Sequence, residues 1–180
     1  MTCTILGSGF GLYGYLPAIL ECGQHVLLPQ HYRSRLRSRQ DVRHLDGCVQ
    51  WCTDEEDALR SSDTVIFAQR PADQMQRLGE YLKYPNIVRL LLEKPLAPDA
   101  GHAQQMLYEL QNSRKRFRIG YNFRYTDWGR ALRKLRKSAA NEGLFLIEWK
   151  FRANHYASNV TTWKRRVSAG GGAFGFTASN

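Results

Sequence analysis

Short apolar runs alternate with amphipathic stretches over the first 119 residues of the chain. The apolar runs are continuous, which is typical of strands buried on both faces of a parallel sheet. They cover residues 3–7, 25–29, 63–69, 87–95 and 117–122. The stretches between them predict helices over residues 12–22, 54–62, 71–82 and 98–113. Because strands and helices alternate, the pattern predicts an α/β fold with a doubly wound parallel sheet and ligand sites at the carboxyl ends of its strands.

The pattern changes after residue 123. Residues 126–139 predict a basic amphipathic helix, and residues 143–154 predict a long strand before a glycine-rich ending. The apolar residues of that helix, which we expect to pack inward, are Trp128, Leu132 and Leu135. One helix, one strand and a loop do not form an independent core, so this part of the chain predicts an incomplete second domain.

The chain of 180 residues carries a net charge of +10, and its basic residues form clusters. These clusters lie at residues 33–39, 114–118, 130–137 and 164–166. They would suit a nucleic-acid surface, solvated helix faces or, for the first cluster, the phosphate of a cofactor. The sequence has no recognised nucleic-acid module and its aromatic residues form no stacking strip, so we expect no nucleic-acid partner.

We expect neither a membrane nor a metal partner. No apolar run reaches the roughly 20 residues that a membrane-spanning helix needs, and the chain opens with a predicted strand rather than a basic leader. Three of the four cysteines lie in or beside apolar segments, and no pair has C-x-x-C spacing. This is typical of buried thiols in a reducing compartment and predicts a cytoplasmic protein.

The stretch LGSGFGLYGYLPAI near the N-terminus has the beginning of a dinucleotide-binding turn. Gly7 would let the chain turn out of the first strand, and Gly9 would let its backbone approach a pyrophosphate. Leu12 stands where the pattern requires a third glycine, which normally lets helix and strand pack closely. We expect Gly11 and Gly14 to supply this space. The turn alone is a weak signal, but its place between a predicted strand and a predicted helix strengthens it.

Arginines follow the second predicted strand, where an acid normally binds the ribose of NAD. No Asp or Glu appears there before Asp41, whereas Arg33 and Arg35 do. An arginine can pair with a 2′-phosphate, which favours NADP over NAD as the cofactor. Alternatively, these arginines only begin a solvated helix. Tyr32 or Gln30 is a further candidate for contact with the adenine or ribose.

A Glu-Lys-Pro sequence leaves the apolar run at residues 87–95. It places Lys94 at the carboxyl end of the predicted sheet, where its ammonium could donate to a substrate oxygen or help to place a nicotinamide. Glu93 could pair with Lys94 and tune its charge, and Pro95 restricts the backbone of Lys94. The alternative is an ordinary exposed Glu–Lys pair at the end of a strand.

Five motifs stand in a specific order along the whole chain: GSGFGLYGYLPA, DTVIFAQRPADQ, EKPLAPDAGHAQQM, GYNFRY and TWKRRVSAGGGAF. In this order and spacing the sequence resembles the glucose–fructose oxidoreductase / inositol dehydrogenase (Gfo/Idh/MocA) family. The resemblance implies an NAD(P)-binding Rossmann domain over residues 1–121. It also implies a partial substrate and oligomerisation domain with antiparallel strands over residues 122–180. The implied activity is hydride transfer between NAD(P) and a sugar, cyclitol or polyol, in a protein that is a homo-oligomer at full length.

The same resemblance implies roles for individual residues. The pyrophosphate turn matches Gly7, Gly9, Phe10, Gly11 and Leu12. The segment beside the cofactor matches Ala68, Gln69, Arg70 and Pro71, and the Glu-Lys-Pro element matches Glu93, Lys94 and Pro95, with the lysine in the active site. The substrate side matches Asn122, Arg124, Trp163 and Arg165.

One departure from the family pattern concerns proton transfer. The acid/base Asp and His of the family fall on Phe176 and Asn180, neither of which performs that chemistry at neutral pH. His155 is a lone histidine after a predicted strand and is more typical of a surface or packing residue. The alternative to an active oxidoreductase is therefore a truncated or degenerate relative that binds a nucleotide, or only a partner, without turnover.

Overall fold

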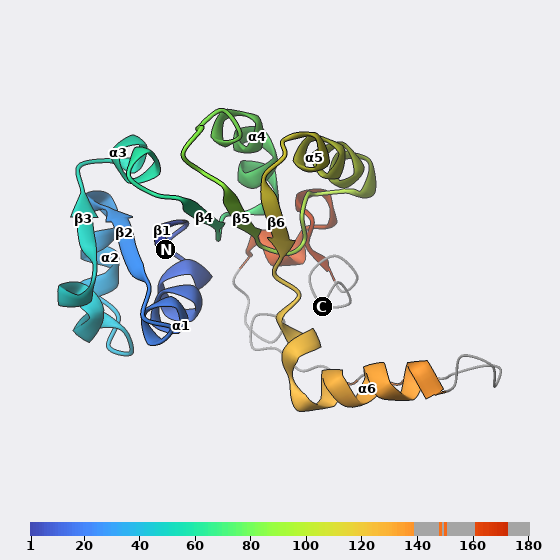
Figure 1. Ribbon diagram of the computed structural model, residues 1–180. Helices are drawn as coiled ribbons and strands as arrows, with labels where there is room; N and C mark the ends of the chain where they lie inside the picture. The colour runs from blue at the N-terminus through green and yellow to red at the C-terminus, as the bar shows by residue number, and fades with distance from the viewer. Residues whose placement is uncertain (139–147, 149, 151–160, 173–180) are drawn as a thin grey trace.

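The computed structural model describes residues 1–138, 148, 150 and 161–172. Six parallel strands form one sheet in the order β3-β2-β1-β4-β5-β6 (Figure 1). The strands are β1 (Thr2–Leu6), β2 (His25–Pro29), β3 (Gln50–Cys52), β4 (Thr64–Phe67), β5 (Arg89–Leu92) and β6 (Arg116–Ile119). The strand order reverses between β1 and β4, which confirms the predicted doubly wound sheet and places its ligand crevice beside these two strands.

The helices cover both faces of the sheet. They are α1 (Leu16–Glu21), α2 (Arg33–Arg37), α3 (Glu55–Arg60), α4 (Pro71–Tyr81) and α5 (Ala100–Asn112). In Figure 1, α1 and α2 lie on one face and α3, α4 and α5 on the other. Asp54 and Asp99 cap α3 and α5 by accepting backbone N–H bonds, which explains where these helices begin.

The region between β2 and α3 contains structure that the apolar pattern did not predict. Three-residue β3 pairs with β2, and short 3₁₀ segments, η2 (Gln30–Tyr32) and η3 (Arg43–Cys48), flank α2. These elements are too short to show a periodicity of their own.

The core consists of two apolar layers, one on each face of the sheet. In β4, for example, Val65 and Phe67 pack into one layer and Ile66 into the other. Successive strand residues face opposite sides, and both sides are covered, which is why the strand sequences are continuously apolar. The helices pack apolar residues onto these layers: Leu16 of α1 is buried in one, and Met106 and Leu110 of α5 are buried in the other.

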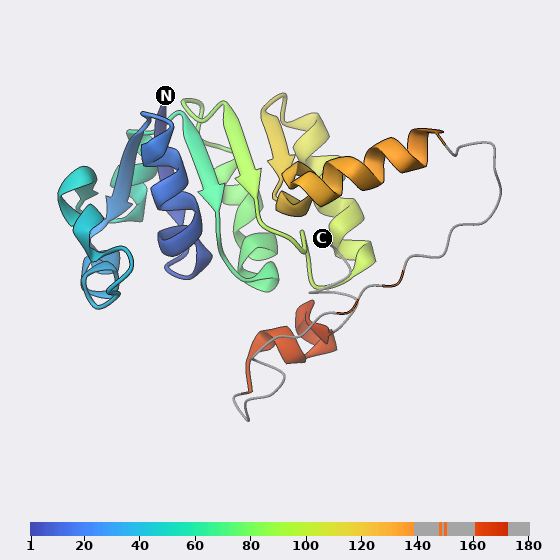
Figure 2. The same cartoon turned by 90° about the horizontal axis from the view of Figure 1, so that it is seen from below.

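The last described helix, α6 (Asp127–Ser138), confirms the predicted helix but not its predicted packing. Trp128, Leu132 and Leu135 are exposed, so the inward orientation expected for them was wrong. Both views show α6 projecting beyond the end of β6 and away from the sheet, so the sheet does not cover it (Figures 1 and 2). Of the strand expected at residues 143–154, all positions but Glu148 and Lys150 lie outside the described residues.

Three further observations bear on the expected chemistry. Cys3 and Cys52 are buried, whereas Cys22 and Cys48 are exposed, so burial accounts for two of the free thiols. Within the described part of the chain, no helix has the length and apolar character needed to cross a bilayer. The same residues contain no group of three or more His, Cys, Asp and Glu side chains placed to hold a metal ion.

Gln74 of α4 ties that helix to the loop after β5. Its side chain is fully buried, and its Nε2 donates to the carbonyl of Leu96 at 2.8 Å and to that of Glu93 at 3.2 Å. The Oε1 atom accepts from the N–H of Glu93 at 3.1 Å. A single amide therefore satisfies the backbone of a loop that carries Glu93 and Lys94.

Replacing Gln74 with leucine should lower the free energy of unfolding by about 1–3 kcal/mol, because the buried carbonyl of Leu96 loses its donor. Urea denaturation measures this change. The matched control is Gln76→Leu on the exposed side of α4, which should alter stability by less than about 0.5 kcal/mol. Equal stabilities of the two variants would contradict the role assigned to Gln74.

Candidate functional site

A cavity of about 1150 Å³ opens at the carboxyl ends of the strands. Its walls come from the loops that follow β1, β4 and β5, from three residues after β2, from residues 122–123, and from residues 161–164 and 166. Twelve residues predicted from the sequence line it: Gly7, Gly9, Phe10, Tyr32, Arg35, Ala68, Gln69, Arg70, Glu93, Lys94, Asn122 and Trp163. The structure thus brings together residues separated by more than 150 positions.

Gly7 lies where the backbones after β1 and β4 meet. Its φ is +118°, and a Cβ at this position would lie 2.2 Å from the carbonyl oxygen of Ala68. Both facts require glycine, since a side chain would be strained and would also collide with backbone. The N–H of Gly7 donates to the hydroxyl of Tyr32 at 2.9 Å, which fixes the first turn of the loop.

Gly11 lies one residue before Leu12, which stands at the third-glycine position of the pattern. A Cβ on Gly11 would lie 2.7 Å from Cγ2 of Ile5 and 3.0 Å from Cβ of Ala68, so helix and strand touch here. Residues Gly11–Tyr15 form a π-helix, η1, whose wider turn changes which residues face the strand. Leu12 therefore points into the core, where it is fully buried, and leaves the cavity lining.

Gly14 is also required by its surroundings, because an added Cβ would lie 2.3 Å from the ring of Phe10. Phe10 in turn packs edge-to-face against Tyr13 and Tyr15. The expectation that Gly11 supplies the missing space between helix and strand agrees with its contacts, whereas the close contact at Gly14 is with Phe10 of the same turn.

The arginines after β2 separate into two groups. Arg35 lines the cavity, and its Nε donates to the carbonyl of Ser8 at 3.2 Å. Arg39 lines it as well, stacked 4.5 Å from the centre of the Tyr13 ring and paired with Asp41 at 2.7 Å.

Arg33 lies outside the cavity lining. It pairs with Asp46 at 2.9 Å and stacks over Trp51. Hydrogen bonds from Arg33 and Arg37 lower the pKa of Asp46 to about 2, so this carboxylate holds both guanidinium groups. Arg33 is therefore an anchor between α2 and η3, whereas Arg35 faces the cavity.

Glu93 and Lys94 lie together at the centre of the cavity wall, before a cis peptide bond between Lys94 and Pro95. Glu93 accepts a hydrogen bond from the hydroxyl of Tyr15. Burial raises the pKa of Glu93, against the opposing effects of the Tyr15 hydrogen bond and the charge of Lys94. Burial lowers the pKa of Lys94, and the nearby charge of Lys164 lowers it further. This is a desolvated acid–base pair rather than an ordinary exposed one.

Five other predicted site residues lie outside the lining: Gly11, Leu12, Pro71, Arg124 and Arg165. Pro71 is buried at the start of α4, and Arg124 stacks over Tyr125. The lining also contains residues that sequence reasoning did not single out: Ser8, Tyr13, Arg39, Asp73, Phe123, Thr161, Thr162, Lys164 and Arg166. Arg39, Lys164 and Arg166 belong to basic clusters, so their charge was visible in the sequence but their position was not. Phe176, Asn180 and His155 lie outside the described residues.

The cavity contains polar groups that still need a partner. Among the described residues, the buried side-chain atoms without a hydrogen-bond partner are Oε1 of Gln69 and Oγ1 of Thr162, and both residues line it. A Cβ on Gly9 would meet no atom within 4 Å, so the backbone there faces open space. An open glycine turn and unsatisfied buried polar atoms fit a bound dinucleotide and a polar substrate.

Solved structures share this fold. The WlbA dehydrogenase from Chromobacterium violaceum, in complex with NADH and UDP-GlcNAcA, matches with a TM-score of 0.63 at 12% identity, over 77% of this chain and 40% of its own. A Gfo/Idh/MocA family oxidoreductase from Vibrio cholerae matches with a TM-score of 0.63 at 18% identity, over 78% and 45%. A super-repressor mutant of Gal80p from Saccharomyces cerevisiae matches with a TM-score of 0.60 at 15% identity, over 78% and 39%.

No protein-family model and no curated protein sequence matches the chain. The chain spans about two fifths of the length of the first solved structures that it matches. The predicted resemblance to the Gfo/Idh/MocA oxidoreductases is thus confirmed at the level of the fold.

The raised pKa of Glu93 predicts a pH dependence of stability. Its ordinary pKa is 4.5, and the folded value lies above this, so the folded chain binds the proton more tightly than the unfolded chain. The contribution of Glu93 to stability is therefore largest below pH 4.5 and is lost as the pH rises through the folded pKa. Each unit of elevation corresponds to about 1.4 kcal/mol.

We therefore expect the stability of the wild type, relative to Glu93→Gln, to rise as the pH falls from 7.5 toward about 4.5. Glutamine keeps an acceptor for Tyr15 but does not titrate. Urea denaturation at several pH values measures the difference, and the exposed Glu80→Gln variant gives the effect of removing a surface carboxylate. A difference that stays constant over this range, or changes in the opposite direction, would show that Glu93 is not held by burial.

Proposed function

We propose that this chain is the nucleotide-binding part of an oxidoreductase of the Gfo/Idh/MocA type. Residues 1–121 would bind a nicotinamide dinucleotide, and residues 122–180 would begin the substrate side. The observation that carries this proposal is the glycine turn at the β1–β4 crevice, which opens into the cavity that contains Lys94. The fold shared with oxidoreductases solved with NADH or NAD supports it.

The cavity offers distinct groups to each part of a dinucleotide. The open backbone at Gly9 suits the pyrophosphate, because no Cβ blocks its approach. Arg35 and Arg39 lie at the end of the cavity that follows β2, where the adenosine ribose binds in this fold. Two guanidinium groups favour a 2′-phosphate, so we propose NADP as the preferred cofactor and NAD as the weaker one.

The residues beside Lys94 suit redox chemistry at a carbon that carries a hydroxyl group. The dinucleotide, when bound, supplies hydride exchange with that carbon. Lys94 would hold the substrate oxygen, and Glu93 would keep the ammonium charged against the effect of burial. Tyr15 fixes the carboxylate of Glu93, so it positions the pair rather than reacting itself. A sugar or a related polyol is the proposed substrate class, in line with the sugar nucleotide bound to WlbA.

A second candidate is a relative that binds the nucleotide without turnover. The positions of the family acid/base residues read Phe176 and Asn180 in this sequence, and the fold is shared with the repressor Gal80p as well as with dehydrogenases. Reduction of NADP⁺ by this chain that depends on an added sugar would establish the first candidate over the second.

Binding of NADPH or NADH to the folded chain tests the proposal directly. Gly9→Ala should weaken binding at least about tenfold, about 1.4 kcal/mol, because the added methyl group occupies the pyrophosphate approach. Isothermal titration measures the affinity. Gly47→Ala is the matched control, since its Cβ also meets no atom within 4 Å but Gly47 lies in η3, outside the cavity. A wild-type chain that binds neither nucleotide would rule the proposal out.

Arginine substitutions test the cofactor preference. Arg35→Gln should reduce NADPH affinity about tenfold and leave NADH affinity nearly unchanged, because only NADPH carries the 2′-phosphate. Arg33→Gln is the control, since Arg33 belongs to the same cluster but faces Asp46. If Arg33→Gln discriminates between the nucleotides and Arg35→Gln does not, the phosphate contact has been assigned to the wrong arginine.

A further inference from the structure

Oxidation of a carbon that carries a hydroxyl group needs a proton acceptor as well as a hydride acceptor. When the carbon gives up its hydride, the hydroxyl hydrogen must leave as a proton. The lining residues that the structure describes include no histidine, and their carboxylates are Asp73 and Glu93. These two side chains are therefore the ones in the lining whose ordinary ionised form accepts a proton.

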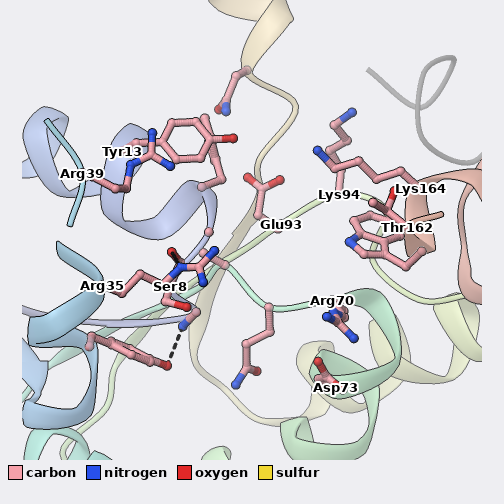
Figure 3. A pocket seen from close by; sticks show the side chains of 18 of the residues that line it. Ser8, Tyr13, Arg35, Arg39, Arg70, Asp73, Glu93, Lys94, Thr162 and Lys164 are labelled. Atoms are coloured by element: carbon pink, nitrogen blue, oxygen red, sulfur yellow. Dashed lines mark hydrogen bonds between the residues drawn. The ribbon is translucent and has the colours of Figure 1, made fainter. Parts of the chain in front are cut away.

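Of the two carboxylates, Glu93 has the better place. It directly precedes Lys94, which would hold the substrate oxygen, and the charge of Lys94 acts on its carboxyl group. Figure 3 shows the carboxylate of Glu93 near the middle of the cavity. Asp73 instead projects from α4, and in this view it lies next to Arg70. A hydroxyl group bound at Lys94 is thus in the surroundings of Glu93 rather than those of Asp73.

The backbone of Glu93 is fixed on both sides of its Cα atom. Its N–H donates to the carbonyl of Phe67 at 2.9 Å and to Oε1 of Gln74 at 3.1 Å. Its carbonyl accepts from Nε2 of Gln74 at 3.2 Å. Because Gln74 is itself fully buried, this backbone is held by the core and not by the ligand. A proton acceptor held in this way keeps its position before the substrate arrives.

Tyr15 fixes the carboxyl group itself. Its hydroxyl donates to Oε1 of Glu93 from η1, outside the cavity lining. A Cβ on Gly120 would lie 2.5 Å from this hydroxyl and 3.0 Å from Oε1. The missing side chain just beyond β6 therefore leaves the space in which the two groups meet. A carboxylate accepts several hydrogen bonds, so the bond from Tyr15 leaves capacity for a hydroxyl group of the substrate.

The surroundings of Glu93 also favour proton exchange. Burial raises the pKa of its carboxyl group, which brings protonation closer to neutral pH than in an ordinary glutamate. The groups that act against burial are Tyr15 of η1, Lys94 of the same loop and Lys164 of η5 (Trp163–Arg165). The carboxyl group thus has access to both the form that accepts a proton and the form that donates one.

We propose that Glu93 is the acid/base of this cavity and that Tyr15 is its positioning residue. During oxidation the O–H bond of the substrate breaks and its proton moves to the carboxylate of Glu93. The hydride of the same carbon goes to the oxidised dinucleotide, and the C=O bond forms. Reduction of a carbonyl runs these steps backwards, with the carboxylic acid returning the proton. This inference rests on the proposed function and supplies a proton carrier other than the family positions, which read Phe176 and Asn180.

The two redox forms of the dinucleotide test the proposal without turnover, because the nicotinamide ring is cationic in NADP⁺ and neutral in NADPH. An ionised carboxylate beside the ring favours the cation. The ratio of NADP⁺ affinity to NADPH affinity should therefore rise at least about threefold between about pH 5 and about pH 8. The phosphates are common to both forms, so their effect cancels in the ratio. Quenching of tryptophan emission in the full chain measures both affinities, and a ratio independent of pH would overturn the proposal.

Two carboxylate variants assign the pH dependence. Glu93→Gln should hold the affinity ratio constant over the same range, because glutamine does not titrate. Asp73→Asn is the matched control, since it removes the other carboxylate of the lining and should leave the pH dependence in place. A pH dependence that persists in Glu93→Gln, or that disappears in Asp73→Asn, would overturn the assignment to Glu93.

Tyr15→Phe tests the positioning role. Phenylalanine keeps the ring that packs on Phe10 but removes the hydroxyl, whose hydrogen bond lowers the pKa of Glu93. The midpoint of the pH dependence should therefore move to higher pH by at least about 0.5 pH unit. NADPH affinity reports whether the variant is folded, and Tyr13→Phe, in the lining, is the matched control.

An unchanged midpoint in a Tyr15→Phe variant that binds NADPH would overturn the role of Tyr15. The Glu93 and Asp73 variants decide the acid/base assignment independently of it. Failure of both nucleotides to bind the wild type would instead contradict the proposed function, so the two failures are distinguishable.

Discussion

The close approach of Gly7 to Ala68 is the contact on which the rest of the site depends. Two parallel strands, β1 and β4, send their chains to opposite faces of the sheet, and their backbones meet just beyond the last residue pair. Only a residue without a Cβ fits there. This contact sets how far apart the following loops lie, and so sets the mouth of the cavity into which Gly9, Gln69 and Lys94 face.

Most of the fold could be predicted from the sequence because both faces of β1, β2 and β4 are largely buried. In β4, residues 65–67 are buried and continuously apolar, and that signal is strong. β3 is only three residues long and carries no such signal. The packing of α6 could not be predicted either, since an amphipathic pattern shows that a helix has an apolar face but not what covers it.

The sequence likewise located some residues of the candidate site but not others. Glu93 and Lys94 could be located because they directly follow a buried strand, whose carboxyl end faces the crevice. The roles of Arg33 and Arg35 could not be separated, because the difference lies in Asp46, a partner thirteen positions further on. Gly11, at the start of the π-helix Gly11–Tyr15, makes the close helix–strand contact that the pattern assigns to the next position. The spacing of glycines in the sequence does not reveal this shift by one residue. Thr162 reaches the site through tertiary structure only.

The two ends of the cavity come from distant parts of the chain, and this has a consequence for biosynthesis. The contacts of the glycine turn join Gly7, Tyr32, Ala68 and Glu93, all of which leave the ribosome before the segment that carries Lys164. Domains generally fold as units in the order of their synthesis. The sheet and its crevice can therefore form while the segment that carries Lys164 is still being translated.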